Sequence, residues 1–152
     1  FAGVMIDANG VPSLLEHNVR FGDPECEALM SLLEGDVLAA LEGCATRSLN
    51  PDLLSIPEGR HAAVVILAAE GYPMNPRSGD PIEGLEQAER LGAKVFHAGT
   101  ARNGESLVTK GGRVLAVTAC GPSREAARAV AYAAADVIEF RGKQLRRDIG
   151  SR

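Results

Sequence analysis

The stretch GGRVLAVTACGPSREAARAVAYAAADVI, residues 111–138, contains the two elements from which the fold can be built outward. Its valine- and alanine-rich part, residues 113–119, predicts a buried strand that follows a turn at Gly111-Gly112. After Gly121-Pro122, Ser123 is a good N-cap for an amphipathic helix. The apolar stripe of this helix consists of Ala127, Val130, Ala131, Ala134, Val137 and Ile138. The pattern therefore predicts a helix packed on a sheet.

Three more strands are predicted upstream of this unit, at residues 62–70, 93–99 and 105–110. The proline- and glycine-rich segment 71–84 predicts an irregular loop between the first two of them. These strands would form a small mixed or antiparallel sheet under the helix.

The N-terminal part begins with two strand-like segments, residues 1–7 and 13–19, around the tight-turn signal Ala8-Asn9-Gly10. A helix is expected to begin at Asp23-Pro24, with Asp23 as its N-cap, and to reach about Cys44 with a bend at Gly35. Its apolar residues at helical spacing are Leu29, Leu32, Leu33, Val37 and Leu41. Residues 48–59 lack periodicity and indicate a linker.

Composition excludes several classes of protein. The 152 residues carry a net charge of -4, and no apolar run approaches the roughly 18 residues of a membrane span, so we expect neither a nucleic-acid nor a membrane partner. The last twelve residues are nevertheless basic, and their positive field suits a small anion. They contain Arg141, Lys143, Arg146, Arg147 and Arg152 against Asp148.

The three cysteines, Cys26, Cys44 and Cys120, have no C-x-x-C spacing. They indicate neither a disulfide framework nor a zinc site, and we expect a reducing cytoplasm. The chain opens on Phe1 within an apolar run, and we interpret it as a piece of a longer protein.

Polar residues recur at every second position near the end of the second strand. On a continuous strand Glu16, Asn18 and Arg20 would share one face. A carboxylate and an amide oxygen at this spacing can meet at one divalent cation, and Mg²⁺ fits best because it needs few protein ligands. Arg20 could neutralise phosphate or carboxylate oxygens. The alternative is that Glu16 and Arg20 form only an exposed ion pair.

The opposite face of the same strand would carry His17, Val19 and Phe21. We therefore expect His17 to be packed or hydrogen-bonded on the core side, and not to act in catalysis.

The segment LLEHNVRFGDPE, residues 14–25, resembles the EFNxRFGDPE signature of the phosphoribosylamine–glycine ligase family, within the ATP-grasp superfamily. His17 departs from the phenylalanine that is usual there. The loop segment MNPRSGD, residues 74–80, also differs from the family pattern. The resemblance continues in the same order through AEGYP (69–73), VFHAGT (95–100), GGRVLAVTA (111–119) and RRDIG (146–150).

The resemblance implies a reaction that joins glycine to 5-phosphoribosylamine with cleavage of ATP to ADP and phosphate. It implies that Glu16 and Asn18 ligate Mg²⁺ or Mn²⁺ and that Arg20 is catalytic, in contact with the reacting phosphate or carboxylate. Arg147, and after it Arg146, would bind the ribose phosphate unless both belong to a solvated surface tail. Asp23 is a further candidate for substrate binding.

The expected fold class is α+β, with the end of an ATP-grasp domain at residues 1–48, a linker at 49–59 and a small sheet-plus-helix domain at 60–152. As a C-terminal piece, the chain alone would not be competent in catalysis. Two alternatives stay open: another ATP-grasp carboxylate–amine ligase, or a non-catalytic docking module in which Glu16 and Asn18 are dispensable.

Overall fold

The computed structural model describes residues 2–151. Phe1, in the predicted first strand, and Arg152, in the basic C-terminal segment, lie outside the described residues. The centre of the structure is an antiparallel sheet in the order β5-β9-β6. These strands span His61–Ala68 (β5), Arg113–Gly121 (β9) and Lys94–His97 (β6), which confirms the strands predicted in these regions. The mixed α+β fold class is also confirmed.

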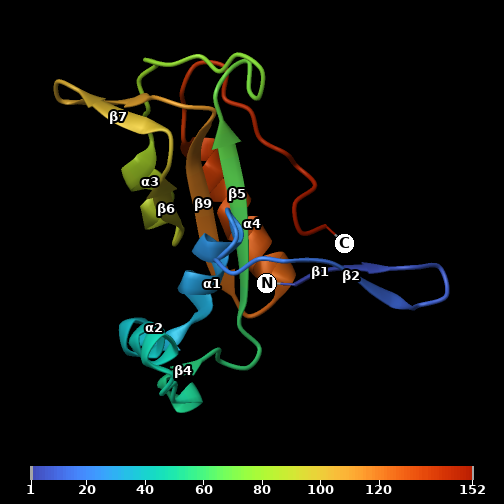
Figure 1. Ribbon diagram of the computed structural model, residues 1–152. Coiled ribbons are helices and arrows are strands. Elements are labelled where there is room, and N and C mark those ends of the chain that lie inside the picture. Colours follow the sequence, from blue (N-terminus) through green and yellow to red (C-terminus); the bar gives the residue numbers. More distant parts are fainter. Residues whose placement is uncertain (1, 152) are drawn as a thin grey trace.

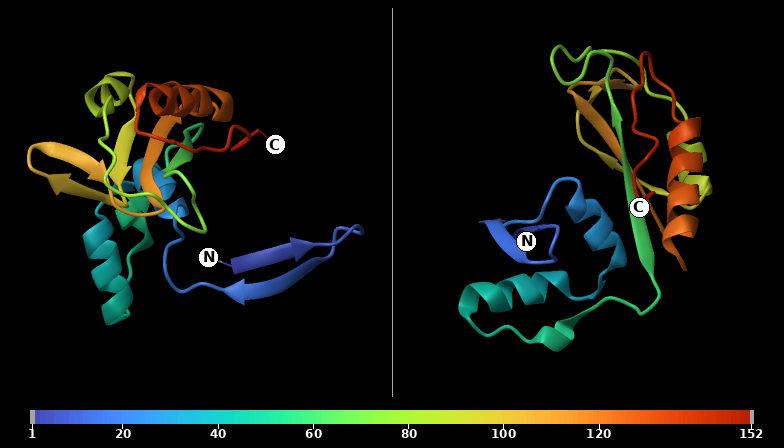
Figure 2. Two further views of the ribbon diagram at one scale, coloured as in Figure 1. Left: turned by 90° about the horizontal axis from the view of Figure 1, so that it is seen from above. Right: turned by 90° about the vertical axis from the view of Figure 1, so that its right-hand side faces the viewer.

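Helix α4, Arg124–Val137, covers one face of this sheet, while α1, Glu25–Leu32, lies against the other face (Figures 1 and 2). The predicted N-cap is confirmed, because Ser123 Oγ accepts a hydrogen bond from the Ala126 N–H at 3.1 Å. Four residues of the predicted stripe are fully buried: Ala127, Ala131 and Ala134 in α4, and Ile138 directly after it.

Replacing Ser123 by alanine is expected to lower the free energy of unfolding by about 1 kcal/mol, because the Ala126 N–H would lose its cap. Denaturant unfolding measures the change. Ser78→Ala, in an exposed part of the loop, is the matched control and should stay within about 0.5 kcal/mol. Equal stability of the two variants would contradict the capping role.

Two smaller elements lie beside the sheet. Helix α3, Leu85–Arg90, follows the irregular segment predicted at 71–84 and packs near α4 and β6. Strands β7, Thr100–Asn103, and β8, Ser106–Thr109, form their own antiparallel ribbon, so the predicted strand at 105–110 does not join the three-stranded sheet. None of the helices formed by residues 2–151 has the length and apolarity that crossing a membrane requires.

The predicted N-terminal hairpin is confirmed by the antiparallel pair β1, Ala2–Ile6, and β2, Pro12–His17. Gly10 adopts a φ of 82° in the turn, and Asp7 Oδ1 accepts hydrogen bonds from two backbone N–H groups there. These bonds, first that from Val11, lower the pKa of the Asp7 carboxyl. The hairpin projects away from the central sheet (Figure 2).

The prediction of one bent helix up to Cys44 is wrong. Helix α1 ends at Leu32, the extended pair Glu34–Gly35 (β3) follows, and α2 spans Val37–Thr46. Gly35 has a φ of 114° and pairs with β4, Leu54–Ser55, which follows the short 3₁₀ helix η1, Pro51–Leu53. A side chain at Gly35 would meet the Leu53 carbonyl oxygen at 2.0 Å, so a distant segment of the chain breaks the helix here.

Candidate functional site

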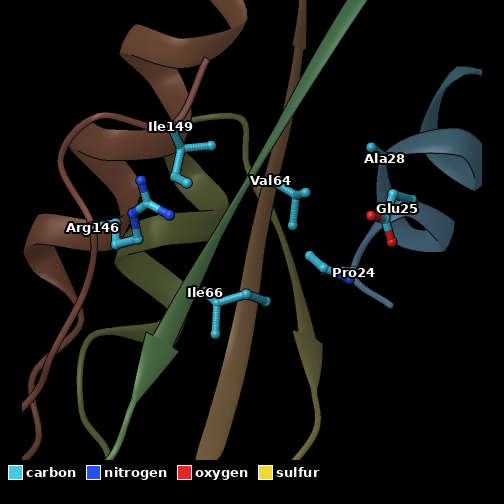
Figure 3. Close-up of a pocket in the computed structure, with 7 residues that line it drawn as sticks. All are labelled: Pro24, Glu25, Ala28, Val64, Ile66, Arg146 and Ile149. Atoms are coloured by element: carbon cyan, nitrogen blue, oxygen red, sulfur yellow. The ribbon is translucent and has the colours of Figure 1, made fainter. Parts of the chain in front are cut away.

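Two adjoining cavities form a groove on the face of the sheet that α1 covers. The larger, of about 430 Å³, lies between the start of α1, β5 and the C-terminal segment (Figure 3). Its lining residues are Pro24, Glu25, Ala28, Val64, Ile66, Arg146 and Ile149. The smaller, of about 340 Å³, is lined by Ile66, Ala68, Tyr72, Arg113, Gln144, Leu145 and Arg146. Both share Ile66 and Arg146, so the Arg146 side chain lies where they meet.

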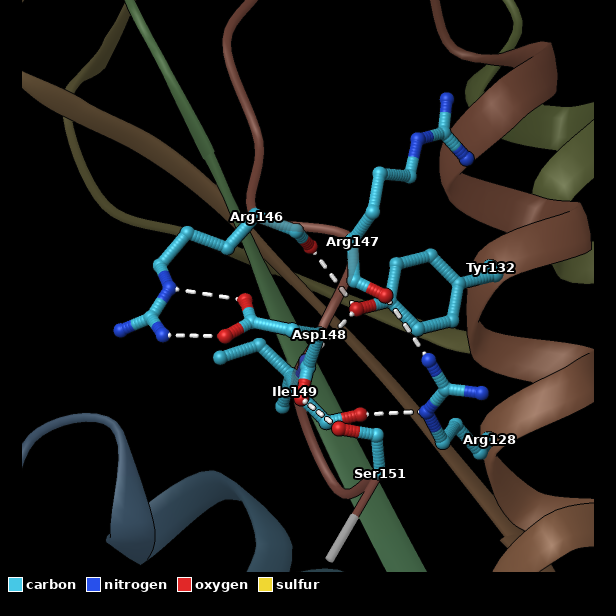
Figure 4. Close-up of polar contacts among 7 residues, drawn as sticks. All are labelled: Arg128, Tyr132, Arg146, Arg147, Asp148, Ile149 and Ser151. Atoms are coloured by element: carbon cyan, nitrogen blue, oxygen red, sulfur yellow. Dashed lines mark hydrogen bonds and ion pairs between the residues drawn. The ribbon is translucent and has the colours of Figure 1, made fainter.

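Arg146 is oriented by a bidentate ion pair with Asp148. Its Nε lies 2.9 Å from Oδ1 and its Nη2 lies 2.5 Å from Oδ2. This hydrogen bonding raises the pKa of the Arg146 guanidinium and lowers the pKa of the Asp148 carboxyl. Both groups therefore stay charged at neutral pH, and Figure 4 shows the Arg146 guanidinium turned toward the Asp148 carboxylate.

Arg147 points to the α4 side. Its guanidinium pairs with both carboxylate oxygens of Asp136, at 2.7 and 3.0 Å, and lies 5.8 Å from the ring centroid of Tyr132. The hydrogen bond from Arg147 is the main cause that lowers the pKa of Asp136. Of the two predicted tail arginines, the structure thus brings Arg146 and not Arg147 to the cavities.

The backbone of the C-terminal segment is tied to α4 by two residues that the sequence reasoning missed. Tyr132 Oη donates to the Arg146 carbonyl at 2.8 Å and accepts from the Ile149 N–H at 3.1 Å. Arg128 donates to the carbonyls of Arg147 and Ile149, at 2.8 and 2.5 Å (Figure 4). Arg128 and Tyr132 are four residues apart on α4, and this spacing was the sequence signal that the two side chains lie on one helix face.

Glu16 and Asn18 lie next to each other, although not on one continuous strand as predicted. Strand β2 ends at His17, so Asn18 and Arg20 lie beyond it and the prediction of a strand up to residue 19 is wrong. The Asn18 side-chain amide nevertheless donates to Glu16 Oε1 at 2.9 Å. The Arg20 guanidinium donates to the Phe21 carbonyl at 3.0 Å.

The expected packing of His17 is wrong in the described structure. The His17 side chain is exposed, Val19 is fully exposed, and Phe21 is 45% exposed. Because the hairpin projects from the sheet, this face of the strand has no core to contact among residues 2–151.

Asp23 is not the N-cap of α1, which corrects another prediction. Pro24 occupies the cap position, and no side chain caps the helix there. Asp23 Oδ2 instead accepts a hydrogen bond from Arg113 Nη2 at 2.6 Å, and Arg113 Nη1 lies 3.4 Å from the Asp23 carbonyl oxygen. The Asp23–Arg113 pair therefore connects the segment after Glu16 and Asn18 to the start of β9.

Within residues 2–151, no group of three or more His, Cys, Asp and Glu side chains could hold a metal ion. The chemistry of Glu16 and Asn18 still fits Mg²⁺ or Mn²⁺, because a carboxylate and an amide oxygen are hard ligands and the two side chains are adjacent, with Asn18 Nδ2 donating to Glu16 Oε1 at 2.9 Å. To share a cation with Glu16, the Asn18 amide would present its oxygen in place of this N–H. Mg²⁺ commonly completes its shell with water and substrate phosphate.

Comparisons with known proteins identify relatives of this chain. The family described as "Phosphoribosylglycinamide synthetase, C domain" matches residues 62–152. The chain is 47% identical over 150 residues to a phosphoribosylamine–glycine ligase of Mesorhizobium japonicum, covering 99% of this chain and 35% of the relative. It is 46% identical over 156 residues to a chloroplastic phosphoribosylamine–glycine ligase of Arabidopsis thaliana, covering 100% of this chain and 29% of the relative.

Among solved structures, a crystal structure of phosphoribosylamine–glycine ligase from Thermotoga maritima matches with a TM-score of 0.81 and 40% identity. The match covers 97% of this chain and 35% of that chain. The chain thus spans about a third of the length of the relatives it matches.

Proposed function

The chain belongs to the phosphoribosylglycinamide synthetase C-domain family, and from this premise we propose that it is part of a phosphoribosylamine–glycine ligase. The reaction joins glycine to 5-phosphoribosylamine and cleaves ATP, giving glycinamide ribonucleotide, ADP and phosphate. The observation that carries the proposal is similarity along 99% of this chain at 47% identity. Three cysteines without a disulfide support a cytoplasmic location.

Glu16 and Asn18 are the proposed ligands of Mg²⁺ or Mn²⁺. When bound, the cation neutralises charge on the ATP phosphates. Arg20, two residues further along, is proposed to contact the phosphate or carboxylate oxygens that carry charge during the reaction. Phosphoryl transfer depends mainly on alignment and charge stabilisation, so these residues need only bind and orient the reacting groups.

The phosphate of 5-phosphoribosylamine is proposed to bind at the groove, with Arg146 as the first contact in the C-terminal segment. Arg146 lines both cavities, whereas Arg147 is engaged by Asp136. A guanidinium suits this role because its planar set of N–H donors matches phosphate oxygens. Asp23 would take part indirectly, through its bond to Arg113.

Arg146→Gln is expected to raise the KM of the full-length ligase for 5-phosphoribosylamine by roughly tenfold or more, the usual loss for a charge-assisted hydrogen bond. Arg147→Gln should raise it less, since Arg147 lies at Asp136. Steady-state kinetics with each substrate varied in turn measure both effects. A larger effect of Arg147→Gln, or equal increases in the KM values for ATP and glycine, would contradict the assignment.

The proposed function itself is tested by product formation in the full-length ligase with ATP, glycine or 5-phosphoribosylamine omitted in turn. Product should form only when all three are present. Product with a different amine in place of 5-phosphoribosylamine would favour another carboxylate–amine ligase. Full activity after loss of both Glu16 and Asn18 side chains would favour the docking alternative.

A further inference from the structure

A β-bulge determines where the Arg113 side chain points. Strands β5 and β9 pair in regular register as far as Leu67 and Leu115, and then Ala68 pairs with Arg113. Val114 is the extra residue, and such a bulge reverses the face on which the following side chains lie. Val114 consequently joins the core at 0% exposure, while Arg113 shares the groove face with Ala68. In a regular strand, Arg113 would have shared the buried face of Leu115.

The Arg113 guanidinium is oriented by hydrogen bonds to Asp23 that use only some of its N–H groups. Its two described hydrogen bonds go to the side chain and the carbonyl of Asp23. A guanidinium has more N–H groups than these two bonds use. The Arg113 side chain is 40% exposed, so its remaining edge is accessible from the smaller cavity.

Arg113 and Arg146 line the same small cavity from different elements, β9 and the C-terminal segment. Each is oriented by one aspartate, Asp23 or Asp148, and each keeps further donors for a ligand. The wall between them includes Tyr72, whose ring packs on Gly112 so closely that a Cβ there would lie 2.4 Å from the ring. Two guanidinium groups that line one cavity can together bind a phosphate monoester, an arrangement that we call the arginine clamp.

The larger cavity has a different character. Besides Arg146 it contains the carboxylate of Glu25, and its other walls are apolar. A carboxylate repels phosphate but accepts hydrogen bonds from hydroxyl and amine groups. The smaller cavity, which no Asp or Glu side chain of residues 2–151 lines, therefore suits a phosphate better than the larger one does.

We propose that Arg113 is a second phosphate-binding residue, which with Arg146 holds the phosphate of a sugar phosphate in the smaller cavity while the sugar extends toward Glu25. This inference rests on the proposed function for the identity of the sugar phosphate. Asp23 acts in it as a positioning residue, because it holds Arg113 and does not itself contact the phosphate.

The test uses ribose 5-phosphate as a stable competitor of 5-phosphoribosylamine in the full-length ligase, with ribose as the probe that lacks phosphate. Arg113→Gln is expected to raise the inhibition constant of ribose 5-phosphate roughly 10- to 100-fold, the range for losing a charge-assisted hydrogen bond. The KM values for ATP and glycine should change less than about twofold. Arg113→Lys should give an intermediate increase, because it keeps the charge and loses the planar fork.

Arg90→Gln is the matched control, since Arg90 pairs with Glu86 on α3 away from both cavities and its loss should leave the inhibition constant unchanged. Thermal unfolding identifies a variant that fails to fold, in which case Arg113→Lys decides. An unchanged inhibition constant in a folded Arg113 variant would overturn the inference, as would equal inhibition by ribose and ribose 5-phosphate. If the wild-type protein makes no product, the proposed function fails, and calorimetric titration with ribose 5-phosphate still tests the arginine clamp.

Discussion

Replacing Glu16 by alanine is expected to lower the turnover of the full-length ligase by about a hundredfold or more. The carboxylate is one of only two proposed protein ligands of the cation, so the variant loses half of that set. Asn18→Ala should have an effect in the same direction, because the Asn18 amide lies 2.9 Å from Glu16 Oε1. The measurement is the steady-state rate as a function of Mg²⁺ concentration.

His17→Phe is the matched control for both variants, because His17 lies between Glu16 and Asn18 in the chain and its side chain is exposed. Turnover should stay within about tenfold of the wild-type value, and thermal unfolding reports any change in packing. Loss of activity in folded His17→Phe with retained activity in Glu16→Ala would show that the wrong side chain has been assigned.

Leu115→Ala is expected to lower the free energy of unfolding by about 2 to 5 kcal/mol. Leu115 is 0% exposed in β9, the central strand of the sheet, and the shortened side chain would leave a cavity in the core shared with α4. Denaturant unfolding measures the effect. Leu38→Ala is the control, since Leu38 is 76% exposed on α2 and should change stability by only about 0.5 kcal/mol. Equal effects would contradict the packing described.

Local signals were sufficient for the hairpin and for α4. Asn9-Gly10 is a local turn signal, because Gly10 adopts the positive φ that the turn requires. For α4, Ser123 predicts where the helix begins and the alanine stripe predicts which face is buried. The break at Gly35 could not be predicted in the same way, because the carbonyl that excludes a side chain there belongs to Leu53. A contact between residues this far apart in the chain produces no periodic pattern in the local sequence from which the break could be predicted.

The candidate site shows the same division. Glu16 and Asn18 were expected to lie close together on one strand face; they are joined by a hydrogen bond, but β2 ends at His17, so the shared strand face on which the prediction rested is absent. Arg113 was missed because its orientation depends on the bulge at Val114, which strict strand alternation does not anticipate. The different surroundings of Arg146 and Arg147 likewise depend on α4, which supplies Asp136 for the second arginine.

Binding of Mn²⁺ tests most directly whether Glu16 and Asn18 form a cation site. The free ion is followed by electron paramagnetic resonance as Mn²⁺ is added to the full-length ligase with ADP, for the wild-type protein and for Glu16→Gln. Loss of one carboxylate ligand should weaken Mn²⁺ binding about tenfold or more, while thermal unfolding of the protein without metal stays unchanged. Equal Mn²⁺ affinity in the wild-type protein and folded Glu16→Gln would contradict the account.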